Sequence, residues 1–384
     1  MMKRSILLYC VIIAFFQCGN QAAIEAADPG SVTVFYPGIS GMTASRICPS
    51  PLEKLDLIAI TAVGDIMTGS HVTRFLDVHG NGYPFDSTRQ VLNKSGMTIG
   101  NLEAPYGTSG VKFDKKFNFM IHPRYSSGLK SAGLDVVTLA NNHMMDYGEE
   151  ALRSTLRTLD SLGIAYSGAG VDLDHARMPA VLEEDSITVA FLGCSMTYPT
   201  EFWAGKDRAG TWYPTERSLV DQIRLCEEIA DYTVVSFHWG QERRNSPKDY
   251  QKHFAHLAID TGADLVLGHH PHVLQGVEIY KNRLIIYSLG NFAFGSYSYS
   301  ARESIILRVY LWGRGLLFAR VFPITVNNHE VLFQPRLLHG ARADSLIDYL
   351  NQISMPLNGG ISPVADNGII LPVSEADSVQ HAKE

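Results

Sequence analysis

The sequence predicts an α/β protein in which helices flank a layered β-sheet core, followed by an antiparallel β annex at the C-terminal end. Two patterns support this class. Short apolar runs, typical of strands buried on both faces, alternate with amphipathic helical spacings between residues 57 and 299. Beyond residue 300, apolar segments follow one another with only turns between them, which is typical of antiparallel strands.

The expected strands are short apolar segments spread over the central part of the chain. They cover residues 57–63, 97–99, 136–140, 189–192, 233–237, 265–267 and 284–287. Between them, apolar residues at helical spacing predict helices: Leu152–Leu156–Leu159, Leu219–Ile223–Cys226 and Phe254–Leu257–Ala258. Gly163 and Gly262 follow two of these patterns and predict where those helices end.

The C-terminal annex is predicted over residues 300–355. Its expected strands are Ser304–Leu311, Leu316–Val321 and Val331–Phe333. The remaining residues, 356–384, are polar with scattered Pro and Gly, so we expect a flexible tail. The main domain is therefore predicted to span residues 57–299, and residues 21–56 are expected to be a spacer.

The first 20 residues differ from the rest of the chain. Lys3 and Arg4 precede the apolar run Ile6–Phe16, an order that predicts a signal peptide and export to the periplasm or cell surface. A buried N-terminal helix is the alternative. The cleavage mode stays open, because Cys18 is a candidate lipid anchor while the stretch Ala22–Ala27 suits ordinary cleavage.

Composition excludes several classes of protein. Of the 384 residues, 46% are hydrophobic and 18% are charged, which is typical of a globular protein and not of a disordered one. The net charge is −7 and no basic block occurs, so we expect no nucleic-acid partner. None of the cysteines forms a CxxC pair, which argues against a thiolate zinc site and a disulfide framework, although one disulfide bond stays open.

Polar clusters follow the predicted strands at the points where these strands end. Because the carboxyl ends of parallel strands meet at one edge of a sheet, the clusters are expected to converge there. They are Asp65; Asn101 and Glu103; Asn141, Asn142 and His143; His238 and Glu242; and His269, His270 and His272. Carboxylate, amide oxygen and imidazole ligands suit divalent Mn, Fe, Zn or Co. The sequence therefore predicts a site for one or two such ions.

Single members of these clusters have simpler explanations. A lone buried His is usually a hydrogen-bonded core residue, and an Asp after a strand, such as Asp65, often caps the next helix. Three histidines within four positions favour a metal site instead. If the segment around Pro271 is extended, His270 and His272 point the same way.

Six motifs, in this order and spacing, resemble those of the CapA/PgsA poly-γ-glutamate capsule-synthesis family. They are GDIM (64–67), GNLEAP (100–105), LANNHMMDYG (139–148), FHWGQE (237–242), GHHPHVLQGVE (268–278) and SLGNF (288–292). That family is similar to the calcineurin-like metallophosphoesterases. The resemblance covers residues 57–296 and implies a metallophosphoesterase-like domain with a role in capsule or poly-γ-glutamate biosynthesis.

The resemblance also implies roles for individual residues. The metal ligands would be Asp65, Asn101, Glu103, Asn142, His238, His270 and His272. His143 would be the general acid. Apart from the resemblance, its neighbour Asp146 is a candidate to orient it, and an N-cap of the next helix explains Asp146 at least as well. Met67 stands where the superfamily has a His, and Asn101 where it has a bridging Asp, so Glu103 would supply the missing charge. A single metal ion, or a weak second one, is consistent with these departures.

The remaining marked residues are expected to lie around the site. Glu242 is a candidate partner of a metal-bound His, His269 stands beside the ligand pair, and Asn291 belongs to a turn that would line the site. Trp239 would either stack on a substrate ring or belong to the core.

Three functions stay open on the sequence alone. The first is a metal-dependent phosphoesterase-like hydrolase acting on an envelope polymer or another phosphoester. The second is a non-catalytic binding or scaffold component of capsule synthesis and export. The third is a metal-dependent amide hydrolase acting on a polyglutamyl or peptidoglycan chain. Membrane-embedded capsule-synthesis components are candidate partners in each case.

Overall fold

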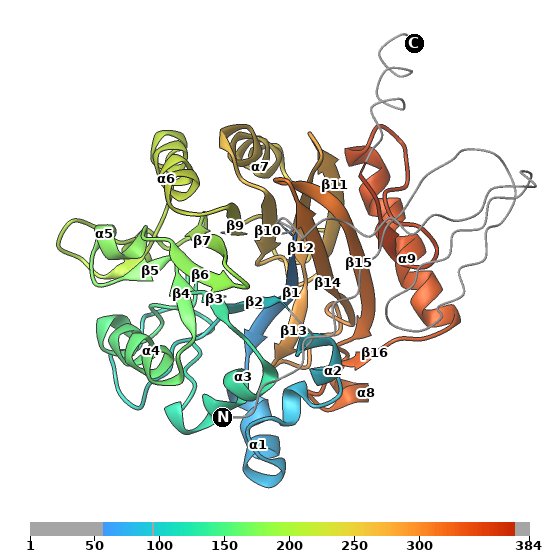
Figure 1. Cartoon of the computed structure of the whole chain (residues 1–384). Coiled ribbons are helices and arrows are strands. Elements are labelled where there is room, and N and C mark those ends of the chain that lie inside the picture. Colours follow the sequence, from blue (N-terminus) through green and yellow to red (C-terminus); the bar gives the residue numbers. More distant parts are fainter. Residues whose placement is uncertain (1–56, 94–95, 373–384) are drawn as a thin grey trace, which may run out of the picture. The chain divides into compact units, whose positions relative to one another are not determined.

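The computed structural model describes residues 57–93 and 96–372 (Figure 1). The predicted signal peptide, the spacer and the candidate lipid anchor Cys18 lie outside these residues, as does the stretch 373–384. Within the described part, no helix is both long and apolar enough to cross a membrane. Cys194 and Cys226 are free and buried.

Most strands belong to one of two β-sheets. The first sheet has the order β16 (Arg336–Leu337), β15 (Gly315–Thr325), β14 (Glu303–Trp312), β1 (Leu57–Met67), β2 (Met97–Leu102), β3 (Val136–Thr138) and β4 (Ala165–Ser167), with β13 (Asn291–Phe294) beside β1 and β17 (Ile369–Ile370) beside β15. The second sheet has the order β11 (Leu274–Tyr280), β12 (Arg283–Leu289), β10 (Leu265–His269), β9 (Tyr232–His238), β7 (Ile187–Ser195) and β6 (Ala180–Glu184). A short pair, β5 (Ala169–Gly170) and β8 (Gly210–Thr211), is separate.

Helices lie between these strands in the sequence. The longer ones are α4 (Gly148–Leu162), α6 (Glu216–Ile229), α7 (Asp249–Thr261) and α9 (Ala341–Ser354). The shorter ones are α1 (Thr73–His79), α2 (Arg89–Leu92), α3 (Ser127–Ala132), α5 (Leu173–Ala176) and α8 (Asn328–Val331). Single 3-10 turns are η1 (Ser70–Val72), η2 (Tyr83–Phe85), η3 (Pro123–Tyr125), η4 (Thr200–Phe202) and η5 (Met355–Leu357).

Local sequence signals account for the ends of the long helices. Gly163 ends α4 in the left-handed conformation, as its position in the sequence predicts. Thr215 and Ser218 form a reciprocal cap at the start of α6. Gly262 follows α7 with a φ of 129°, a conformation that favours glycine.

The two sheets pack face to face, with an apolar layer between them formed by both sheets and by α9. A second apolar cluster joins the outer face of the first sheet to α1, α2, α3 and α4, and a third joins the outer face of the second sheet to α6 and α7 (Figure 1). The predicted α/β class, with helix layers around a sheet core, is confirmed. The core contains two sheets. The strand pattern in the sequence did not show whether the strands form one sheet or two.

The C-terminal part differs from expectation in three details. The hairpin β14–β15 is antiparallel as predicted, but β14 pairs with β1 and so extends the first sheet. Val331 ends the short helix α8 instead of starting a strand, and residues 341–354 form α9. Part of the expected tail is ordered, because β17 pairs with β15. Apolar content alone does not distinguish a buried helix from a strand in such short segments.

Candidate metal centre

The candidate centre lies where the layer between the sheets changes from apolar to polar. Strands β1–β2–β3 and β7–β9–β10 each run parallel within their sheet, so their carboxyl ends lie at one edge. Alternation along each strand places the polar residue on the same face as the apolar ones before it. Thus Asn101 follows Met97 and Ile99, His238 follows Tyr232 and Val234, and His269 follows Leu265 and Leu267.

The turn before β13 contacts β1 at this edge and requires glycine in both segments. The backbone N–H of Asp65 donates to the carbonyl of Gly290 at 2.9 Å. A Cβ atom at Gly64 would lie 1.9 Å from that carbonyl oxygen, and Gly290 has a φ of 72°. The close approach brings Asp65 beside Asn291 in the register of β1 and β13.

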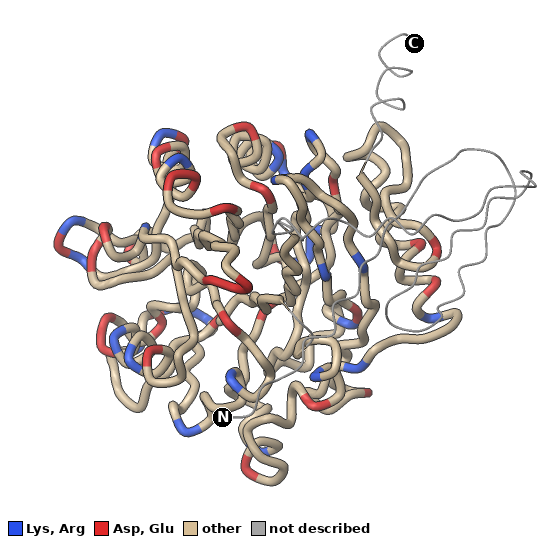
Figure 2. Tube along the Cα trace, in the orientation of Figure 1, with Lys and Arg blue, Asp and Glu red and all other residues tan. Residues whose placement is uncertain are grey.

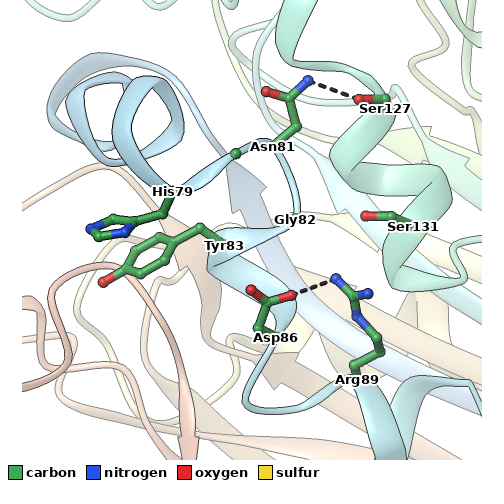
Figure 3. Close-up of a pocket in the computed structure, with 9 residues that line it drawn as sticks. His79, Asn81, Gly82, Tyr83, Asp86, Arg89, Ser127 and Ser131 are labelled. Atoms are coloured by element: carbon green, nitrogen blue, oxygen red, sulfur yellow. Dashed lines mark hydrogen bonds and ion pairs between the residues drawn. The ribbon is translucent and has the colours of Figure 1, made fainter.

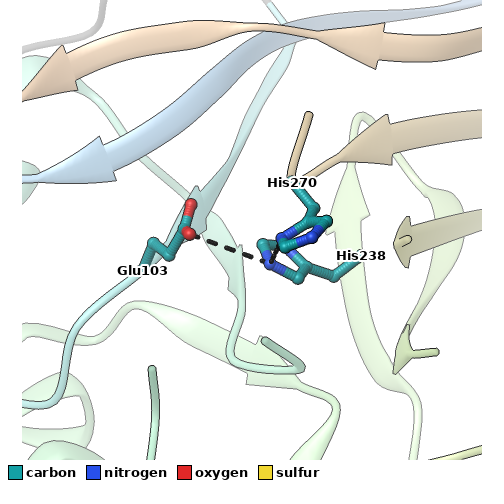
Figure 4. A group of neighbouring side chains, drawn as sticks. All are labelled: Glu103, His238 and His270. Carbon is teal, nitrogen blue, oxygen red and sulfur yellow. Dashed lines mark hydrogen bonds and ion pairs between the residues drawn. The ribbon is translucent and has the colours of Figure 1, made fainter. Parts of the chain in front are cut away.

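Two groups of side chains are arranged so that each could hold a metal ion, and they share Glu103. The first ligand set is Glu103, His238 and His270, and the second is Asp65, Glu103 and His272. In the first set, His238 Nε2 lies 3.8 Å from Glu103 Oε1 and 3.2 Å from His270 Nδ1 (Figure 4). In the second, His272 Nε2 lies 3.7 Å from the same Glu103 oxygen, and His272 Nδ1 lies 3.2 Å from Asp65 Oδ2.

The chemistry of these sets fits a divalent cation. Asp65 and Glu103 are both fully buried, yet Glu103 Oε1 accepts no hydrogen bond and Asp65 Oδ2 has only His272 Nδ1 beside it, at 3.2 Å. A buried carboxylate oxygen without a partner is costly unless a proton or a cation compensates it. Oxygen and imidazole donors together suit Mn, Fe, Zn or Co. The two sets therefore fit one divalent ion, or two that share Glu103.

Electrostatics differ sharply between neighbouring groups of the centre. Burial raises the pKa of Glu103 well above its usual value, and the charge of Asp65 raises it further. Burial alone would raise the pKa of Asp65, but hydrogen bonds from His269 and His272 hold it well below the usual value. Burial would lower the pKa of His272, yet the two carboxylates raise it to about 10. The second ligand set therefore already attracts positive charge.

The first ligand set contains neutral histidines. Burial lowers the pKa of His270 to about 3, and the nearby His272 lowers it further. Burial also lowers the pKa of His238 well below the usual value, with His270 adding to the effect. A neutral imidazole is the form that binds a metal ion, so both residues are in the ligand form at neutral pH.

Asn101 hydrogen-bonds both carboxylates in this arrangement, and its expected role as a metal ligand stays a prediction. Its side-chain N–H groups donate to Asp65 Oδ1 at 2.8 Å and to Glu103 Oε2 at 3.2 Å. Its oxygen accepts from Asn141 Nδ2 at 3.0 Å. Asn141 is itself held, because it also donates to the carbonyl of Leu102 and accepts from the backbone N–H of His143. The amide oxygen of Asn101 is thus engaged away from the ligand sets.

The segment of His270 and His272 is not extended, contrary to the sequence interpretation. His270 has a φ of 96° and His272 a φ of 59°, which are strained values for residues other than glycine. The two imidazole rings lie 6.1 Å apart, centroid to centroid, and belong to different ligand sets. Such strain often accompanies functional sites. Here it places His270 in the first ligand set and His272, two residues later, in the second.

His143 and Asp146 lie together at the margin of the centre. His143 Nδ1 is 2.8 Å from Asp146 Oδ2, and that oxygen also accepts from the backbone N–H of Phe119 at 2.7 Å. Asp146 is fully buried and precedes α4 without capping it, because the residue before the helix is Tyr147. Of the two explanations left open for Asp146, the geometry favours contact with His143 over capping of α4.

Three of the other expected site residues contact members of the ligand sets directly, and a fourth, Glu242, acts through its charge. Asn142 Oδ1 lies 2.9 Å from His238 Nε2, Asn291 Oδ1 lies 2.9 Å from His272 Nδ1, and His269 Nδ1 lies 3.2 Å from Asp65 Oδ1. Glu242 is exposed and acts on Glu103 and His272 through its charge. These residues surround the two ligand sets.

Trp239 lies away from the site, which corrects its grouping with the substrate residues. It is fully buried, stacks on Phe237 at a centroid distance of 4.2 Å and donates to the carbonyl of Tyr287. Because successive residues at the end of β9 face opposite sides of the sheet, His238 faces the centre and Trp239 faces the helix layer. Met67 likewise packs in the cluster around α1.

A separate hollow of about 570 Å³ lies between α1, η2 and α3 (Figure 3). Its lining includes His79, Tyr83, Asp86 and Arg89, with Ser127 and Ser131 on the opposite wall. Asp86 and Arg89 form an ion pair with each other inside it. None of the ligand-set residues lines this hollow, so it is distinct from the candidate metal centre.

The family model of the bacterial capsule synthesis protein PGA_cap matches residues 59–296, which is more than half of the chain. The chain belongs to this family. All residues of both ligand sets lie within the matched region, as do His143 and Asp146. The sequence resemblance to the CapA-type capsule-synthesis family is thereby confirmed.

Relatives of this PGA_cap chain carry capsule-related names. The capsule biosynthesis protein CapA of Bacillus anthracis is 31% identical over 289 residues, covering 73% of this chain and 70% of that one. The PGA biosynthesis protein CapA of Bacillus subtilis is 32% identical over 275 residues, covering 71% and 72%. Among solved structures, a Haemophilus influenzae NAD nucleotidase is 12% identical with a TM-score of 0.43, covering 77% of this chain and 56% of that one.

Two residues of this PGA_cap site were missed by sequence reasoning about ligands. Asn141 was noted after its strand but given no role, although it fixes the orientation of Asn101. Lys115 lies in the segment between β2 and α3, far from any strand end, and contacts His143 and Asp146. No periodicity or motif marks such a lysine.

Figure 2 shows how acidic and basic residues are interspersed along the rest of the trace.

Proposed function

We propose that this PGA_cap family member is a metal-dependent hydrolase that cleaves a phosphoester or related bond of an envelope polymer. One observation carries the proposal. A single buried oxygen, Glu103 Oε1, lies between His238 Nε2 and His272 Nε2 and accepts no hydrogen bond. A carboxylate oxygen in that position is suited to face a cation on one or both sides.

The residues present assign roles around such an ion. Both ligand sets would hold it, with Asn142 beside the first and Asn291 beside the second. A bound divalent ion supplies a water of lowered pKa and a positive charge against phosphoryl oxygens. Asn101 keeps the two carboxylates apart and oriented. His143, held by Asp146, would donate a proton to the leaving oxygen.

The biological setting is part of the same proposal. The names of the relatives from Bacillus anthracis and Bacillus subtilis support a role in capsule or poly-γ-glutamate synthesis. Membrane-embedded components of that synthesis are the expected partners. The Lys3–Arg4 start and the apolar run after it support export, with Cys18 as the candidate lipid anchor.

A binding or scaffold role is the second candidate, and one observation favours it. Asn101 donates to both carboxylates, and His272 lies beside them as a cation, so the cluster is partly compensated without a metal ion. An amide hydrolase would use the same centre, because a metal-bound water also attacks carbonyl carbon.

Metal content and product analysis distinguish the three functions. We expect the purified protein to bind one or two divalent ions and to hydrolyse a chromogenic phosphoester, with both properties removed by a chelator and restored by Mn²⁺ or Zn²⁺. Absence of metal and of turnover would leave the scaffold role. A metal-loaded protein that releases amine from a polyglutamyl chain, and no phosphate from the phosphoester, would establish the amide hydrolase.

A further inference from the structure

Lys115 belongs to the segment 107–121, which has no helix or strand and lies against the candidate metal centre. Only 19% of its side chain is exposed. Its ammonium group donates to the carbonyl of Asn142 and forms an ion pair with Asp146 Oδ1. It also lies 4.9 Å from the centre of the Phe202 ring. A half-buried cation at this place is not explained by solubility or by surface charge.

The rest of the segment is fastened to the same few residues. The backbone N–H of Phe113 donates to the carbonyl of Asp146 at 2.9 Å, and that of Phe119 donates to Asp146 Oδ2 at 2.7 Å. The Phe119 ring lies 4.6 Å from the ring of His143. Asp146 is therefore held by two backbone groups and one lysine, all contributed by this segment.

These contacts determine which nitrogen of His143 carries the proton. The carboxylate of Asp146 only accepts hydrogen bonds, so the short 2.8 Å contact requires a proton on His143 Nδ1. Lys115 Nζ lies 3.3 Å from the same nitrogen and, being a donor itself, cannot bond to a protonated Nδ1. Its role there is to hold Asp146 in place through the ion pair with Oδ1. His143 Nε2 is then the atom free to exchange a proton with a substrate.

The ammonium group is not available for substrate. A lysine has three N–H donors. One points at the Asn142 carbonyl, one side faces Asp146 Oδ1, and the Phe202 ring covers another. A substrate-binding lysine would keep at least one donor directed at solvent. Lys115 thus acts through its protein neighbours.

We propose that Lys115 is a positioning residue of the His143–Asp146 pair, and that the segment 107–121 carries it there. It fixes Asp146 so that His143 is held as the Nδ1–H tautomer. It also holds the backbone of Asn142, whose side chain lies beside the first ligand set. The inference rests on the proposed function insofar as it gives His143 a proton to transfer.

The test replaces the charge while keeping the length of the side chain. Lys115→Met removes the cation and Lys115→Arg retains it, while Lys116→Met, at an exposed neighbouring position, is the matched control. The His143 tautomer is read by ¹⁵N NMR of histidine-labelled protein, with the signal assigned through a His143→Gln variant. This readout needs no substrate.

We expect wild type, Lys115→Arg and Lys116→Met to hold His143 as the Nδ1–H tautomer, and Lys115→Met to show a mixture. Metal content should be equal in all four proteins. If the protein hydrolyses a phosphoester, Lys115→Met should lower kcat by about 10- to 100-fold, as is typical for partners behind a ligand or a catalytic group, with KM nearly unchanged. Lys115→Arg should recover most of that loss.

The failures of the two proposals are distinguishable. If no protein turns over substrate but the tautomer of His143 depends on Lys115, the proposed hydrolase is wrong and the positioning role stands. If folded Lys115→Met keeps the wild-type tautomer, the positioning role is wrong, whatever the activity. Should Lys115→Met fail to fold, Lys115→Gln replaces it, because the neutral side chain also removes the cation and must then release the tautomer.

Discussion

Two buried carboxylates of this protein, Asp264 and Asp65, have opposite surroundings. Asp264 accepts from the backbone N–H of Thr233 at 2.9 Å and pairs with Arg283 and Arg314 at 3.2 Å each. Asp65, equally buried, has only His272 Nδ1 beside Oδ2, at 3.2 Å, and Glu103 next to it leaves Oε1 without a hydrogen bond. We call Asp264 a closed carboxylate, because the fold supplies its hydrogen-bond and ion-pair partners. We call Asp65 and Glu103 open carboxylates, because each keeps one oxygen that a cation could contact.

The difference separates a carboxylate that supports the fold from those that could bind a ligand. A buried polar atom without a partner costs about 1–3 kcal/mol, so leaving Glu103 Oε1 in that condition beside a second carboxylate requires compensation. Glu278 shows that the fold can satisfy a buried Glu, because it accepts from Tyr287 at 2.6 Å and lies 2.8 Å from His256 Nε2. The open oxygens therefore mark the centre more specifically than burial or charge does.

The comparison is tested most strongly by the histidines. We expect His270→Ala and His272→Ala to lower metal content, because each removes a member of one ligand set. His143→Ala should leave the metal bound but lower turnover by about a hundred- to ten-thousandfold, the usual contribution of a general acid. Metal analysis by mass spectrometry together with a phosphoester assay measures both effects. Loss of metal in His143→Ala to the same extent as in His272→Ala would show that the roles are wrongly assigned.

Glu103→Gln should be the next largest effect. The substitution keeps the shape of the side chain but removes the charge shared by both ligand sets, so metal affinity should fall by more than about a hundredfold, beyond the typical loss for a partner behind a ligand. The metal-free protein should lose little stability, because burial and the charge of Asp65 both oppose the charged form of Glu103 and raise its pKa. Isothermal titration with Zn²⁺ and thermal denaturation provide the two measurements.

Glu278→Gln is the matched control for that experiment. It changes a buried Glu whose oxygens both have partners, so metal affinity should stay within about twofold of wild type while the free energy of unfolding falls by about 1–3 kcal/mol. The opposite pattern, in which Glu278→Gln loses metal and Glu103→Gln loses stability, would remove the distinction between open and closed carboxylates.

Asp264→Asn should act on stability alone. In this variant an amide NH₂ group replaces one carboxylate oxygen, and its nitrogen cannot accept a hydrogen bond from Thr233. The neutral amide also forms no ion pair with Arg283 or Arg314. Since both arginines are partly exposed and can be rehydrated, we expect a loss of about 1–3 kcal/mol in the free energy of unfolding. Denaturant titration measures the loss, and an unchanged metal content separates this carboxylate from Asp65.

The sequence predicted the location of the centre better than its details. Asp65, His238 and His269 each follow an apolar strand, and parallel strands bring such residues to one edge whatever the loops do. In the structure these residues meet across both sheets because strand alternation is local and has a period of two. The same rule explains why Trp239, adjacent to His238, faces the core.

Details that depend on loops and on backbone conformation were not predictable. His270 and His272 adopt positive φ values, which residues other than glycine disfavour. The residue types themselves therefore give no sign of this conformation. Lys115 reaches His143 across 28 residues of sequence through a segment without regular structure. Asn101 was expected to be a ligand, and its hydrogen bonds to Asn141 and Asp65 depend on side-chain orientations that no spacing specifies.

The smallest expected effect concerns protons released when a metal ion binds, and it separates the two ligand sets. Burial would lower the pKa of His272, but Glu103 and Asp65 raise it to about 10, so this imidazole is protonated in the metal-free protein at pH 7. A metal ion requires the lone pair that the proton occupies, so an ion entering the second ligand set must release about one proton.

The first ligand set behaves differently. Burial lowers the pKa of His270 to about 3, and that of His238 is also lowered, so neither holds a proton to release at pH 7. An ion confined to this set should bind with almost no proton release from histidine. Because lowering the pH strengthens proton competition at His272, affinity for the second set should fall by up to about tenfold per pH unit below 10.

Isothermal titration of the metal-free protein at pH 7, repeated in buffers of different ionisation enthalpy, counts the protons. Release of about one proton per ion, with affinity that increases from pH 6 to pH 8, places the ion in the second set. Release close to zero with pH-independent affinity places it in the first. The pKa of Glu103 is also raised, by burial and by the charge of Asp65, so His272→Gln is the necessary control. That variant should lose the proton attributed to His272 and keep any contribution from Glu103. If its proton count equals that of wild type, the charge on His272 is not what the ion displaces.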